Sequence, residues 1–184
     1  MQRALEGSIG VFAMKVTVWQ RLDFLARNLT PLLITLVFVI VSVMPTRLPG
    51  ASYIVPAFVL MSVYYWSLHR ADLLPAIAVF AIGLLQDILS GTPLGLNAVV
   101  LIGVYGVGIT QRRFFYGKSF LVVWWGFMSI AAVAMALSWL LMAVFSEGLL
   151  SPRPALFEYL MTVTFYPPVA WLFGQIHRVL PRRE

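Results

Sequence analysis

Long apolar runs separated by short polar stretches set the pattern of this chain from residue 31 onward. A helix needs about 20 mostly apolar residues to cross the roughly 30 Å hydrocarbon core of a bilayer. Six runs approach or reach that length. They cover residues 31–48, 53–68, 74–89, 94–110, 120–145 and 156–176. The pattern therefore predicts an all-α membrane protein, a polytopic bundle of about six transmembrane helices.

Prolines and glycines interrupt two of these runs. Pro167 and Pro168 lie in the last run, where their missing N–H donors are expected either to kink the helix or to divide it. Gly103, Gly106 and Gly108 leave part of the fourth run without bulky side chains. Small residues let helix backbones approach closely in membranes. We expect these glycines to serve packing within the chain rather than dimerisation, and a homodimer stays open.

The composition narrows the chemistry that the chain can perform. Of its 184 residues, 61% are hydrophobic and 11% are charged, whereas soluble domains carry about 25% charged residues. The absence of cysteine excludes disulfides and thiolate metal sites, and His69 and His177 are too far apart to suggest a metal site. Glu158 is expected in the first turn of the sixth helix, where a negative charge suits the N-terminus. With no catalytic motif present, we expect a non-enzymatic protein without a cofactor or metal.

The basic residues predict the orientation of the spans. Nearly all of the 13 Lys and Arg residues fall on one side, with Arg47 and Arg153 on the other. An excess of basic residues marks cytoplasmic loops, so both termini are expected in the cytoplasm. The expected lipid-interface anchors are Trp19, Trp66, Arg112, Arg113 and Trp124. We expect anionic lipid rather than nucleic acid to be the partner of this basic side.

The chain divides into three parts on this interpretation. They are a cytoplasmic tail at 1–30, the six-helix transmembrane domain at 31–176 and a second basic cytoplasmic tail at 177–184. In the first tail Val18, Leu22, Leu25 and Leu29 share one helical face. This pattern predicts an amphipathic helix lying on the membrane surface. A basic tail without regular structure is the alternative.

Asp87 is the acidic residue placed well within an apolar run, near the predicted outer end of the third span. A carboxylate inside a bilayer is unfavourable and is usually functional or paired. The short turn that follows forces the third and fourth helices into an antiparallel hairpin. Gly91, Pro93 and Gly95 shape this turn, and Asn97 is expected to bond a neighbouring helix. Either Asp87 organises the turn by accepting loop hydrogen bonds, or the turn recognises a partner or a small ligand.

The same stretch carries a resemblance to a known family. Residues 83–98 read Gly-Leu-Leu-Gln-Asp-Ile-Leu-Ser-Gly-Thr-Pro-Leu-Gly-Leu-Asn-Ala, preceded by Tyr65-Trp66, His69 and Leu74-Pro75. This pattern resembles MreD, the rod shape-determining membrane protein family of bacteria. The length, the six-run layout and the basic pair before Phe114 also fit. One departure is Arg70-Ala71 after His69, where a proline is common in the family.

The resemblance implies a place in the bacterial cytoplasmic (inner) membrane and a non-enzymatic role in rod cell shape. It implies a scaffold or regulator of the peptidoglycan elongation machinery. The implied partners are MreC most directly, with MreB, RodA and a class B penicillin-binding transpeptidase through the complex. The implied fold is similar to the substrate-binding subunits of energy-coupling-factor transporters. A small-molecule-binding membrane subunit of such a transporter is therefore the alternative function.

Overall fold

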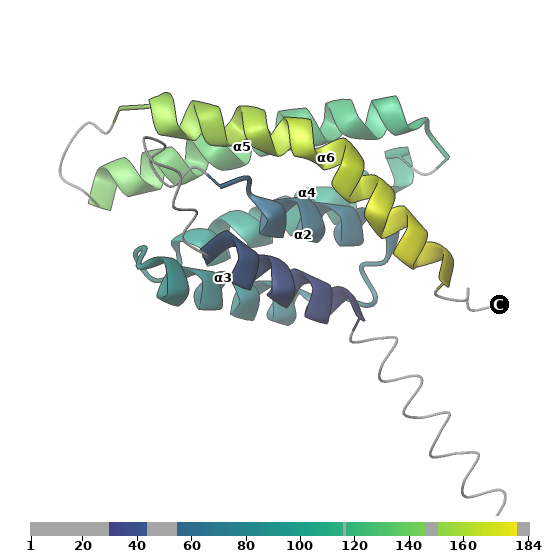
Figure 1. The fold of residues 1–184 in the computed structure, drawn as a ribbon, viewed down its shortest axis with the longest axis horizontal. Coiled ribbons are helices and arrows are strands. Elements are labelled where there is room, and N and C mark those ends of the chain that lie inside the picture. Colours follow the sequence, from purple (N-terminus) through teal and green to yellow (C-terminus); the bar gives the residue numbers. More distant parts are fainter. Residues whose placement is uncertain (1–29, 44–54, 116, 146–150, 180–184) are drawn as a thin grey trace, which may run out of the picture. The chain divides into compact units, whose positions relative to one another are not determined.

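The computed structural model describes residues 30–43, 55–115, 117–145 and 151–179, and the chain divides into two units, Met1–Thr30 and Pro31–Glu184. All regular structure in these described residues is helical, which confirms the expected all-α class. The helices are Thr30–Val43, α2 (Phe58–His69), α3 (Ala76–Ser90), α4 (Leu96–Phe115), α5 (Phe120–Phe145) and α6 (Arg153–Val179). Each lies at one of the six predicted apolar runs (Figure 1).

Length and composition set α5 apart from the other helices. It has 26 residues and begins and ends where the sequence predicts. Within the described part of the chain, α5 is the helix both long and apolar enough to cross a membrane, whereas Thr30–Val43 and α3 are apolar but shorter. α4 continues to Phe115, beyond its expected end at residue 110. α6 begins earlier than expected, at Arg153, because Pro154 is tolerated in a first helical turn.

α2 is the central helix of the second unit. Its side chains from Val59 to Leu68 are all buried, and α4 and α6 both pack against it. From the helix Thr30–Val43, the Thr35 hydroxyl shares a hydrogen bond of 2.8 Å with the hydroxyl of Ser62. Figure 1 shows α2 enclosed by these neighbours. A helix that is apolar on all sides is stable where every face is covered.

Aromatic rings from α2, α5 and α6 form much of the core and correct one expectation. Trp66 is 0% exposed, and its ring centroid lies 5.8 Å from that of Phe173. Tyr64 packs beside the stacked rings of Phe127 and Tyr166, whose centroids are 3.9 Å apart. The prediction that Trp66 anchors the protein at the lipid interface is wrong. The enclosing helices leave α2 no face that could reach lipid.

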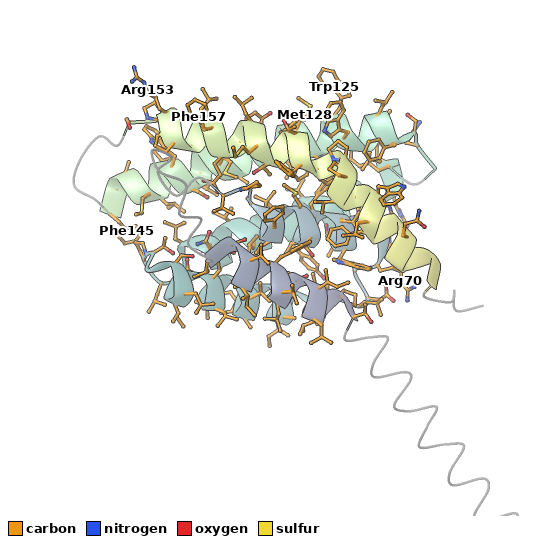
Figure 2. All side chains as sticks on the ribbon, viewed as in Figure 1. Arg70, Trp125, Met128, Phe145, Arg153 and Phe157 are labelled. Atoms are coloured by element: carbon orange, nitrogen blue, oxygen red, sulfur yellow. The ribbon has the colours of Figure 1, made fainter. Side chains whose placement is uncertain are left out.

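Apolar side chains also cover the outward faces of the helices. Trp125 and Phe157 point away from the bundle in Figure 2. The most exposed examples on α3, α5 and α6 are Ile77, Ile88, Val133, Val144 and Trp171, each 66–79% exposed. Soluble proteins rarely expose apolar surface on this scale. Such a surface suits a surrounding of lipid rather than water.

Pro167 and Pro168 lie inside α6 without dividing it. Figure 1 shows one continuous ribbon whose axis changes direction in its second half. Pro167 has no N–H to donate to the carbonyl of Val163, four residues earlier. The indole Nε1–H of Trp124 on α5 donates to that oxygen instead, at 3.3 Å. Of the two outcomes that the sequence allows, the structure has the kink.

Glycines permit close contact at two of the helix crossings. A methyl group at Gly83 of α3 would collide with the backbone of Ala98 on α4, and one at Gly108 would collide with Ser67 on α2. The expected use in internal packing is therefore confirmed for Gly108. It is wrong for Gly103 and Gly106, which have open space in front of them. Both lie on an exposed side of α4.

Candidate functional site

The last turn of α3 holds a carboxylate that is completely buried. Asp87 is 0% exposed, and four donors surround its two oxygens. Its Oδ1 accepts hydrogen bonds from the Thr92 hydroxyl at 2.9 Å, from the Asn97 backbone N–H at 3.0 Å and from the Asn97 amide at 2.9 Å. Its Oδ2 accepts from the Gly95 N–H at 2.8 Å. Donors in this number stabilise a buried charge that would otherwise be very unfavourable.

The backbone of the turn explains its glycines. Gly91 has a φ of 67° and donates its N–H to the carbonyl of Asp87, which is the left-handed termination that favours glycine at the end of a helix. Gly95 has a φ of 96°. Residues other than glycine rarely adopt a positive φ of this size. The carbonyl of Pro93 accepts the N–H of Leu96 at 3.1 Å, which starts α4. The turn is thus built around one carboxylate.

The structure brings together all five residues singled out at this turn, Asp87, Gly91, Pro93, Gly95 and Asn97. Asn97 bonds a neighbouring helix, as the sequence indicates, and the atom that it bonds belongs to Asp87. Direct recognition of a partner would need exposed carboxylate surface, and Asp87 has none. The geometry therefore favours the first interpretation, in which Asp87 organises the turn.

A cavity of about 430 Å³ lies beside this turn. Several helices line it, and its polar lining includes Ser42, Gln86, Asn97, Ser138 and Glu158. Leucine and methionine side chains and the Trp139 ring form its apolar walls. A volume of this size falls within the usual range of roughly 300–1,000 Å³ for small-ligand sites. The cavity itself could not be predicted from the sequence, because its lining comes from segments far apart in the chain.

Glu158 differs from its expected position. The helix begins at Arg153, so α6 has no acidic residue in its first turn and Glu158 lies one turn further in. There it lines the cavity instead of capping the helix. The earlier start of α6 at its prolines is the reason. Gln86 and Glu158 are polar residues inside predicted apolar runs. Their presence there was an indication that polar groups meet within the bundle.

Basic residues gather at the opposite end of α4. Arg112 and Arg113 are exposed in its last turn, where cations suit the helix C-terminus. Lys118 lies over the Phe114 ring, with its Nζ 5.8 Å from the ring centroid. The exposure of both arginines is compatible with the expected lipid contact. Trp19 lies outside the described residues, as does nearly all of the first tail.

Trp124 and Trp125, near the start of α5, differ in burial and in contacts. The Trp124 ring is half-buried and its N–H bonds the carbonyl of Val163, so its polar edge faces α6 rather than lipid headgroups. Trp125 is 65% exposed and points outward (Figure 2). Trp125 therefore presents more of its ring outward than Trp124, whose expected role as a lipid-interface anchor stays a prediction. Among the described residues, no group of three His, Asp or Glu side chains could hold a metal ion.

Comparison with known proteins identifies a family for this chain. A family model described as rod shape-determining protein MreD matches residues 23–176. No curated protein and no solved structure matches the chain. The matched segment covers most of the chain and contains the Asp87 turn, the residues that line the cavity and the basic end of α4. The chain therefore belongs to the MreD family of rod shape-determining proteins.

Proposed function

We propose that the protein is a non-enzymatic scaffold or regulator of the peptidoglycan elongation machinery. It acts by binding MreC, and through that complex it meets MreB, RodA and a class B penicillin-binding transpeptidase. The observation that carries the proposal is the family match over residues 23–176, which implies a role in rod shape determination. The family is one of membrane proteins, and α5 is long and apolar enough to span a membrane.

The outward apolar faces support binding within the bilayer. Ile88 on α3 and Val133 on α5 belong to surfaces that the described residues leave uncovered. Helices associate in membranes through close packing and a few polar contacts rather than through exclusion of water. A transmembrane helix of a partner could pack on such a surface without any reactive group. The Asp87 turn would then act by holding α3 and α4 in the shape that the partner recognises.

Six spans with both termini in the cytoplasm complete the proposal, together with a place in the bacterial inner membrane. Because the chain has no cysteine, single cysteines can report which side of the membrane a position occupies. We expect Ser90→Cys to react with a membrane-impermeant maleimide from outside the membrane. Lys118→Cys should react only after the membrane is opened. The reverse pattern would contradict the orientation.

The functional test is affinity purification from gently solubilised native membranes, followed by mass spectrometry of the bound proteins. Recovery of MreC with elongation enzymes is the expected result, and a tagged multi-pass membrane protein of unrelated function is the control. Recovery of an ATPase module with a coupling subunit would overturn the proposal in favour of a transporter subunit. Normal rod shape in cells that lack the protein would also contradict it.

A further inference from the structure

Polar groups that line the cavity beside the Asp87 turn lack hydrogen-bond partners among the described residues. The Ser42 hydroxyl and the Gln86 side-chain oxygen are buried and have no such partner. The Glu158 side chain, half-buried in the same lining, makes no hydrogen bond or ion pair with any residue that the structure describes. Buried polar groups are nearly always satisfied in folded proteins. Three residues of one lining with unsatisfied oxygens therefore favour a ligand that supplies the missing donors.

None of the described residues pairs a cation with Glu158. The ion pair found among the described residues joins Arg70 to Asp72, in the loop between α2 and α3 at the other end of α3. Arg153 lies five positions before Glu158 on α6, but it is exposed and points away from the bundle (Figure 2). Asn97 also lines the cavity, and its amide is already committed to Asp87 and Thr92. The carboxylate of Glu158 thus has no counter-charge among the residues that the structure describes.

We propose that this cavity binds a ligand through a primary ammonium group that contacts Glu158, Gln86 and Ser42. An ammonium carries three N–H donors and a positive charge, which matches three oxygen acceptors of which one is a carboxylate. The apolar walls then accommodate a short hydrocarbon portion in the remaining volume of about 430 Å³. The ammonium belongs either to a free small amine or to the headgroup of an amine lipid such as phosphatidylethanolamine. This inference goes beyond the scaffold role and does not depend on it.

The first experiment compares an amine with its uncharged counterpart on the purified full-length protein in amine-free buffer. n-Butylamine is expected to raise the melting temperature, whereas n-butanol of the same size is not. Glu158→Gln keeps the shape of the side chain and removes its charge. Charge-assisted hydrogen bonds contribute about 1.5–3 kcal/mol, so this variant should bind the amine about 10- to 100-fold more weakly. Asp72→Asn removes an exposed carboxylate at the other end of α3 and should leave the affinity unchanged.

A second variant separates the acceptors from the charge. Gln86→Met retains Glu158 and a side chain of similar length, and it should weaken amine binding by a smaller factor than Glu158→Gln. Circular dichroism and gel filtration establish that each variant is folded. Equal shifts with n-butylamine and n-butanol would overturn the proposal, because they would show an apolar site without charge recognition. Full affinity in Glu158→Gln would also overturn it.

The source of the ammonium is settled in lipid nanodiscs. Native mass spectrometry should show phosphatidylethanolamine retained by the wild-type protein and lost from Glu158→Gln, with phosphatidylglycerol unaffected, if the ligand is a lipid. Binding of the free amine alone supports a soluble ligand. Binding of neither overturns the ammonium site and leaves only water in the cavity. Recovery of MreC from membranes is a separate result, so a failure here is distinguishable from a failure of the scaffold proposal.

Discussion

Asp87 and Glu158 are both acidic residues in a strongly apolar chain, and their surroundings are opposite. Asp87 is fully buried and accepts four hydrogen bonds, all from residues within the next ten positions of the chain. Glu158 is half-buried beside a cavity and has no partner among the described residues. The comparison separates a carboxylate used by the fold from a carboxylate left for something else. The extent of burial does not by itself distinguish the two roles. The number of hydrogen-bond donors around each carboxylate does.

The largest expected effect comes from removing the charge that holds the turn. Asp87→Asn places an NH₂ group where N–H donors of Gly95 or Asn97 already point, so hydrogen bonds are lost and donors are left buried. We expect the free energy of unfolding to fall by about 2–4 kcal/mol. Chemical denaturation in detergent, followed by circular dichroism, measures this loss. Asp72→Asn, an exposed control, should stay within about 0.5 kcal/mol of wild type.

The comparison would fail if Asp87→Asn unfolded like the wild type yet no longer bound its partners. That outcome would mean that the carboxylate acts in recognition, and that its hydrogen bonds are replaceable. A loss of stability together with weaker complex formation agrees with a turn that shapes the surface. Copurification at a temperature well below the midpoint of unfolding keeps the two effects apart.

A smaller loss is expected when α3 and α4 are forced apart. In Gly83→Ala the new methyl group meets the backbone of Ala98, which cannot move without shifting α4. Overpacking of this kind lowers stability by about 1–3 kcal/mol. Gly103→Ala, on the open side of α4, is the matched control and should match or slightly exceed wild type. Equal stability of the two variants would show that the Asp87 turn does not depend on close contact between the helices.

The smallest expected effect has the opposite sign. Glu158→Gln removes a half-buried charge that has no counter-charge among the described residues, so desolvation no longer opposes folding. We expect the free energy of unfolding to stay the same or to rise by about 1 kcal/mol in the absence of ligand. The same denaturation measurement applies. A clear loss of stability would mean that Glu158 has a structural partner, and it would end the contrast with Asp87.

The Asp87 turn could be predicted because its parts are adjacent in sequence. An acid, two glycines, a proline and an asparagine within eleven positions contain nearly the whole site, and the short loop allows few other arrangements. The bounds of α5 were predictable for a similar local reason, since a single long apolar run needs no neighbour to identify it. Sequence reasoning works best where the interacting groups are close along the chain.

Other features depend on tertiary contacts and could not be predicted in this way. Trp66 is as apolar and bulky as Trp125, yet one is enclosed by α4 and α6 and the other faces outward. The residue types in an aromatic cluster do not indicate which side of a helix is covered by other helices. Gly103 and Gly108 differ in the same respect. The cavity is the extreme case, since its polar lining comes from positions as far apart in the sequence as Ser42 and Glu158.

The link between Trp124 and the kink in α6 has an evolutionary consequence. Pro167 leaves the carbonyl of Val163 without its helical donor, and the indole of Trp124 uses that carbonyl. A residue with an N–H at position 167 would donate to the same carbonyl and compete with the indole for it. Positions 124 and 167 should therefore covary among related sequences, with proline and a donor side chain gained or lost together. The bend of one helix and its attachment to the next would then be inherited as a single trait.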